Sequence, residues 1–83
     1  MTQISRDTVM ARVTGVFHDI FDDDSLIITD DTSAADIEEW DSLMHITLVV
    51  AMEKEFGLRL KVSEIGKLRN VGIMVDLFLD RLA

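Results

Sequence analysis

The chain has 83 residues, a formal net charge of −8 at pH 7, and neither cysteine nor proline. Its length predicts one small domain over residues 1–83, and its negative charge argues against nucleic acid as a partner. The lack of cysteine excludes disulfides and cysteine-based metal sites, and no stretch predicts a membrane span or a signal peptide. We therefore expect a soluble cytoplasmic monomer without a membrane partner.

The first element predicted along the chain is a helix over about residues 6–21. Ser5 precedes it, and a serine at that position can accept a hydrogen bond from a free backbone N–H of the first turn. Apolar residues recur at helical spacing and predict the buried face: Val9, Val13, Val16, Phe17 and Ile20. Aromatic residues in such a stripe are expected to pack in a core rather than to bind a ligand.

A long connection follows over residues 22–41, and long connections in small domains are usually functional or contain further structure. Ser33 and Asp36 resemble a capping box, which predicts a short helical turn near residues 34–39. Two apolar residues are candidate anchors to the core: Leu26 and Ile28. Ten acidic residues and no Lys or Arg lie within residues 19–41. Their spacing does not fit a calcium-binding loop, so no metal site is predicted.

The most informative stretch is a helix that is expected to begin at Ser42 and to end at Phe56. Asp41 is a favourable N-cap, and Ser42 then lies beside the positive end of the helix dipole. One stripe should face the core: Leu48, Val49, Met52 and Phe56. The other faces are also mostly apolar: Leu43, Met44, Ile46, Thr47 and Val50. A short chain cannot bury a helix on all sides, so these residues either bind a partner or fold against the long loop.

The remaining chain predicts two further helices. Gly57 should end the central helix in a left-handed conformation, and an extended linker follows it. Ser63 is a candidate cap for a short helix over about residues 64–68, and Asn70 for a last helix over 71–82. The inner face of that last helix should contain Val71, Met74, Val75, Phe78 and Leu82. The expected fold is all-α, a small four-helix bundle with three main helices and one short one.

The sequence Asp41-Ser42-Leu43 at the start of an apolar helix that ends in Glu-Lys-Glu-Phe resembles the attachment site of acyl carrier proteins. The resemblance covers most of the chain and implies a four-helix carrier that is not itself an enzyme. It implies that a phosphopantetheinyl transferase esterifies Ser42 with 4′-phosphopantetheine from coenzyme A. The thiol of that arm carries acyl or aminoacyl groups as thioesters in this family. A loading ligase, an acyltransferase or a condensing enzyme is then an expected partner.

Two departures from the family pattern bear on the pathway. The positions of Met44 and Thr47 are commonly acidic in fatty-acid-type carriers, and the family often has glycine where this chain has Glu39 and Trp40. Trp40 either packs on the loop or contacts partners. The predicted partner-binding residues are Trp40, Met44, Ile46, Thr47 and Val50. A specialised pathway is favoured, such as polyketide, nonribosomal peptide, aminoacyl or modified-lipid synthesis, and housekeeping fatty-acid synthesis is the alternative.

Two other functions are weighed against the carrier. An acidic helical adaptor without a prosthetic group could bind a partner through the same apolar face. An enzyme built on Ser42 and His45 is disfavoured, because the sequence has no nucleophile elbow and no second element for an oxyanion hole. His45 is instead expected to be a partly buried packing residue below the turn of Ser42.

Overall fold

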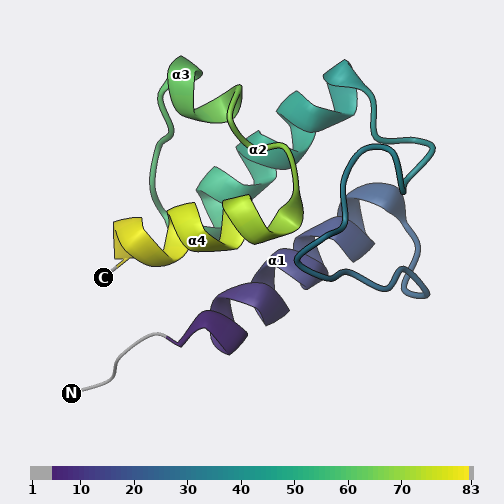
Figure 1. The fold of residues 1–83 in the computed structure, drawn as a ribbon, viewed down its shortest axis with the longest axis horizontal. Coiled ribbons are helices and arrows are strands. Elements are labelled where there is room, and N and C mark those ends of the chain that lie inside the picture. The colour runs from purple at the N-terminus through teal and green to yellow at the C-terminus, as the bar shows by residue number, and fades with distance from the viewer. Residues whose placement is uncertain (1–4, 83) are drawn as a thin grey trace.

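The computed structural model describes residues 5–82, in which there are four helices and no strand (Figure 1). Three helices are long, α1 (Arg6–Phe21), α2 (Ser42–Phe56) and α4 (Val71–Leu82), and α3 (Val62–Ile65) is short. α1 packs against both α2 and α4. The short α3 stands apart from α1 at the top of Figure 1, and the long loop between α1 and α2 occupies the right of the view. The predicted all-α fold, with three main helices and one short one, is confirmed.

The ends of the long helices follow the predicted caps. The side-chain oxygens of three residues accept a hydrogen bond from the backbone N–H three residues further on: Ser5 (3.1 Å), Asp41 (2.9 Å) and Asn70 (2.9 Å). Gly57 ends α2 with a φ of 67°, where a residue with a Cβ would be strained. The bounds predicted for the long helices are therefore confirmed.

The core lies between the inner faces of the three long helices. Its helical residues are almost wholly those that the apolar spacing predicts: Val9, Val13, Val16, Phe17, Leu48, Val49, Met52, Phe56, Val71, Met74, Val75 and Phe78. Ile20 and Leu82 are only half-buried at its edge. Phe56 stacks on Phe78 with ring centroids 4.7 Å apart, which joins the end of α2 to α4.

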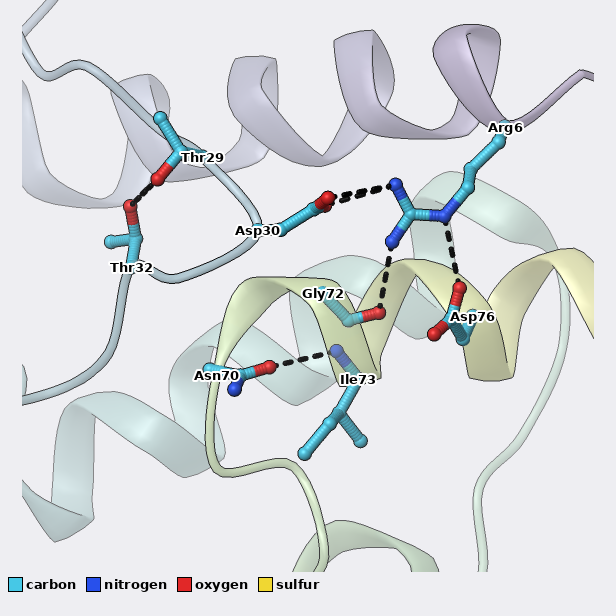
Figure 2. A network of polar contacts seen from close by, with 8 residues as sticks. All are labelled: Arg6, Thr29, Asp30, Thr32, Asn70, Gly72, Ile73 and Asp76. Atoms are coloured by element: carbon cyan, nitrogen blue, oxygen red, sulfur yellow. Dashed lines mark hydrogen bonds and ion pairs between the residues drawn. The ribbon is translucent and has the colours of Figure 1, made fainter.

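Polar contacts hold the long loop against α1 and α4 (Figure 2). The backbone oxygen of Asp30 accepts a hydrogen bond of 2.9 Å from the N–H of Gly72, at the start of α4. The guanidinium of Arg6 lies 2.9 Å from the carboxylate of Asp30 and 2.9 Å from that of Asp76. It also donates to the backbone oxygen of Gly72 at 3.4 Å. One arginine thus joins α1, the loop and α4, and no sequence pattern predicts this network.

Buried groups complete the attachment of the loop. Thr32 is a buried polar residue, and its hydroxyl accepts a hydrogen bond of 2.9 Å from the N–H of Thr29. Its carbonyl oxygen accepts another of 2.9 Å from Val71. Ile28 packs against the core as predicted, whereas Leu26 is held through its carbonyl oxygen, 2.9 Å from a ring nitrogen of His18.

The two predictions for short segments compare differently with the structure. Residues 34–36 and 38–39 form turns, where the sequence predicts a short helical turn, and none of residues 34–39 belongs to a helix. The carboxylate of Asp36 accepts the N–H of Ser33 at 2.9 Å, and Ile37 after this turn is buried in the core. The short helix α3 covers Val62–Ile65 and not residues 64–68. The carboxylate of Glu64 accepts the N–H of Lys61 at 2.9 Å, so Lys61 is the N-cap and the predicted cap, Ser63, lies within the helix.

Candidate functional site

Ser42 is the first residue of α2, and its side chain is exposed. The carboxylate of Asp41 is occupied by the N–H of Met44, and no group within residues 5–82 forms a hydrogen bond with the hydroxyl of Ser42. The N–H groups of the first turn have no helical partners and carry the positive end of the helix dipole. A reactive hydroxyl is therefore presented to solvent at a position that favours negative charge.

A buried aromatic side chain fixes the entry to α2. The ring of Trp40 packs edge-on against Phe17, with centroids 5.2 Å apart, and is only 5 % exposed. Its indole N–H donates to Nδ1 of His45 at 3.2 Å, and the two rings stack. The ring thus packs on α1 and α2 rather than on the long loop. That Trp40 contacts partners stays a prediction, and only 5 % of the residue is exposed to one.

His45 links α2 to α3. Because its Nδ1 accepts the hydrogen bond from Trp40, its Nε2 carries the ring proton and donates to the backbone oxygen of Ile65 at 3.1 Å. The predicted half-buried position is confirmed, although the sequence did not show that both nitrogens are bound. His45 therefore has no free nitrogen to act as a base for Ser42, and the alternative of a Ser-His enzyme has no geometric support.

Glu64 holds α3 in place from the other side. Its carboxylate accepts the backbone N–H of Lys61 and forms an ion pair with Arg81 of α4. These contacts lower the pKa of Glu64 below its ordinary value of 4.5, the hydrogen bond from Lys61 contributing most. The short helix is thus attached to α2 through His45 and to α4 through Glu64.

A surface cleft of about 590 Å³ opens beside Ser42. Its walls come from the loop, from the start of α2 and from the connection between α3 and α4: Ala34, Trp40, Asp41, Ser42, His45, Ile46, Leu68 and Arg69. The sequence did not predict that Ala34, Leu68 and Arg69 belong to this region. The last two lie more than twenty residues after Ser42, and no periodic pattern connects them to it.

One face of α2 next to the cleft is apolar and exposed, and we call it the α2 patch: Leu43, Ile46, Thr47 and Val50. Leu43 is 73 % exposed, Ile46 58 % and Val50 44 %. These side chains do not fold against the long loop, which was the other interpretation of the pattern. Met44, at the border of the patch, is half-buried and packs against the core, so only part of its surface is available to a partner.

Charged groups around the site are unevenly distributed. Exposed Glu38, Glu39 and Asp41 precede Ser42, and Arg69 borders the cleft from the other connection. Across residues 5–82, no three His, Cys, Asp or Glu side chains are grouped so as to hold a metal ion. None of the helices described is long and apolar enough to cross a membrane.

Comparison with known proteins gives matches over most of the chain. Residues 8–78 match the family model described as a phosphopantetheine attachment site. An acyl carrier protein of Petrotoga mobilis is 29 % identical over 79 residues, which are 95 % of this chain and 93 % of that protein. The solution NMR structure of a holo acyl carrier protein from Geobacter metallireducens is 40 % identical, with a TM-score of 0.79. That match covers 88 % of this chain and 83 % of the other.

Proposed function

The chain belongs to the phosphopantetheine-attachment family of acyl carrier proteins, and on that premise we propose that Ser42 is the residue that bears its phosphopantetheine. The observation that carries the proposal is the free, exposed hydroxyl at the first residue of α2, inside the matched region. Asp41 and Leu43 complete the motif around it. As a member of this family the protein is a carrier and not an enzyme.

The residues at this position fit a phosphate-linked group. The phosphodiester would lie beside the N–H groups of the first turn of α2, which favour negative charge. Asp41 does not compete for these donors beyond the N–H of Met44 that it already caps. The adjacent cleft, with apolar Leu68 and Ile46 in its walls, offers space and apolar surface next to the hydroxyl.

Loading requires a partner because, within residues 5–82, no base forms a hydrogen bond with the hydroxyl of Ser42. A phosphopantetheinyl transferase would direct Oγ of Ser42 onto the phosphorus of coenzyme A that bears the pantetheine. The new P–O bond forms, the pyrophosphate bond breaks, the hydroxyl proton is lost, and adenosine 3′,5′-bisphosphate leaves. When bound, the group supplies a thiol that carries acyl or aminoacyl cargo as a thioester.

The α2 patch supports a role in a specialised pathway, and we keep fatty-acid synthesis as the alternative. Its exposed side chains are neutral or apolar, where fatty-acid-type carriers commonly present carboxylates next to the serine. Exposed apolar groups gathered beside a functional residue usually bind another protein. A loading ligase, acyltransferase or condensing enzyme with an apolar docking surface is the proposed partner, and the cytoplasm is the proposed location.

Intact mass tests the attachment site. Incubation with coenzyme A and a broad-specificity transferase should add the mass of one phosphopantetheinyl group, and peptide mapping should find it on Ser42. Ser42→Ala should abolish the gain. Ser63→Ala, which changes another exposed serine near the start of a helix, should leave it unchanged. A group on any other residue would contradict the proposal, and no gain at all would favour the adaptor without a prosthetic group.

A second assay addresses the pathway. The loaded chain is offered to a fatty-acid condensing enzyme and to ligases or acyltransferases of the specialised classes, each with a panel of acyl or aminoacyl donors. Faster charging by a specialised enzyme would support the proposal. Equal or faster use by the fatty-acid enzyme would favour the housekeeping alternative.

A further inference from the structure

Arg69 differs from most arginines of the described chain in having no carboxylate partner. Arg6, Arg12 and Arg81 each form an ion pair, whereas the side chains of Arg59 and Arg69 have no hydrogen-bond or ion-pair partner within residues 5–82. Both unpaired side chains are exposed. They lie in different places, because Arg69 borders the cleft with Ser42 and Arg59 borders a separate cleft near the end of α2.

The backbone holds Arg69 at this cleft from both sides. Leu68 before it is buried in the core, and Asn70 after it caps α4 through the N–H of Ile73. The N–H of Arg69 itself donates to the carbonyl oxygen of Lys67 at 2.9 Å. The side chain of Arg69 is therefore free while its Cα is fixed, which is the arrangement expected of a residue that binds a mobile group.

We propose that Arg69 is a positioning residue that binds the phosphodiester of the prosthetic group on Ser42 and keeps the arm at the cleft. The inference rests on the proposed attachment at Ser42. A guanidinium is always charged, and its planar set of N–H donors matches two phosphate oxygens at once. The phosphodiester is negatively charged, and it would give Arg69 the anionic partner that it lacks within residues 5–82.

The charges around Ser42 favour a position of the phosphodiester near Arg69 over a position near the loop. The chain leading into α2 presents Glu38, Glu39 and Asp41, which repel a phosphodiester. Among the residues of the described chain that line this cleft, Arg69 is the one Lys or Arg. Arg69 attracts the phosphodiester, and the carboxylates of the loop repel it. Both effects favour an arm that lies near the connection between α3 and α4. Lys67, also exposed on that connection, does not border the cleft.

The test compares the loaded native chain with loaded Arg69→Ala, Arg69→Lys and Arg59→Ala. Intact mass first shows that each carries one group. Amide NMR spectra before and after loading then measure the shift changes at Ile46 and Leu68, and the phosphorus spectrum reports the phosphodiester itself. Thermal melts check that the fold is unchanged. The spectra are repeated at low and at moderate ionic strength, since salt screens an exposed ion pair.

Arg69→Ala should lower the equilibrium constant for holding the arm at the cleft by about 1.4- to fivefold, the range for an exposed ion pair. Arg69→Lys should restore part of the effect, and Arg59→Ala should behave like the native chain. Added salt should reduce the shift changes in the native chain and not in Arg69→Ala. Equal shift changes in loaded native chain and loaded Arg69→Ala would overturn the role of Arg69 alone. Failure of the native chain to load would overturn the attachment at Ser42 and this inference with it.

Discussion

The side chains around Arg6 and those around Ser42 differ in whether they have partners. Around Arg6, a guanidinium, two carboxylates and backbone oxygens are all paired with one another (Figure 2). Around Ser42, a hydroxyl, an arginine and the apolar α2 patch are left without partners in the described chain. The long loop passes through both regions, since it is held at Asp30 and ends at Asp41, the residue before Ser42. The contacts that stabilise the loop are thus made before it reaches the functional residue.

The long loop therefore has one part that stabilises the fold and a later part that presents the functional residue. The loop needs a fixed path, because it determines where α2 begins and how Ser42 is presented. The residues that fix the path are paired or buried, so the hydroxyl of Ser42 and the exposed side chains of the α2 patch need not contribute to folding. Substitutions around Arg6 should accordingly change stability, and substitutions around Ser42 should change binding.

The largest expected effect on stability comes from Gly72. A Cβ at this position would lie 3.0 Å from the backbone oxygen of Asp30, which is already hydrogen-bonded to the N–H of Gly72. Gly72→Ala should therefore displace the loop and lower the free energy of unfolding by about 1–3 kcal/mol. Gly15→Ala is the control, because it meets nothing within 4 Å in α1 and should raise stability by up to about 1 kcal/mol. Chemical denaturation of both variants measures the difference. A stabilised Gly72→Ala would show that the loop is not held by this close approach.

The next prediction tests the α2 patch. Ile46→Asp places a carboxylate in a surface that we expect to be buried against a partner, which should slow charging by the cognate enzyme about tenfold or more. Ile27→Asp makes the same change on the long loop, where the side chain is 84 % exposed and lies outside the patch. Both variants should melt close to the native chain, since both side chains are exposed. Equal rates for the two variants would show that the α2 patch is not the surface that the enzyme binds.

The two regions also differ in how far the sequence predicts them. The long helices and the place of Ser42 follow from caps and apolar spacing, which act over a few residues. The contact of Arg6 with Asp76 joins residues 70 positions apart, and Arg69 and Ser42 border the same cleft only because of the fold, so neither pair has a local pattern. The sequence leaves open whether Trp40 packs on the loop or contacts partners, and its burial against Phe17 of α1 depends on residues far away in the chain. The exact path of residues 34–39 is likewise not predicted, because it depends on the burial of Ile37 in the core.

A smaller effect is expected from the arginine that joins the loop to both helices. Hydrogen bonds with Asp76 and Asp30 raise the pKa of Arg6 above its ordinary value, so it stays charged at any pH at which the protein folds. Arg6→Ala should lower the melting temperature by only a few degrees, because the pairs are partly exposed. Arg6→Lys should recover part of the loss, as it keeps the charge but not the three-way contact. Loading of Ser42 should be unaffected, and a loss of loading with a normal melt would contradict the separation of the two regions.

The smallest effect is expected in acid, and it concerns the contacts of Glu64 that hold α3. Because hydrogen bonds from Lys61 and Arg81 lower the folded pKa of Glu64 below 4.5, its contribution to stability is fully present above that value. It is lost as the pH falls through the lowered folded pKa, since protonation removes the charge that these donors bind. The melting temperature of Glu64→Gln should therefore lie slightly below that of the native chain at pH 7 and converge with it as the pH falls below the lowered folded pKa of Glu64.

The fluorescence of Trp40 can report the titration of Glu64 at the functional site. It is the single tryptophan of the chain, and its N–H is bound by His45, whose other nitrogen holds the backbone of α3 at Ile65. If α3 loosens when Glu64 is protonated, the fluorescence of Trp40 should change over the same pH range in the native chain and less in Glu64→Gln. Glu38→Gln, on the exposed turn of the loop, is the matched control and should follow the native chain. The difference in melting temperature between the native chain and Glu64→Gln should shrink toward low pH. A difference that widens instead would have the opposite sign to that expected from a lowered pKa of Glu64. Such a result would mean that Glu64 does not hold α3 as a carboxylate.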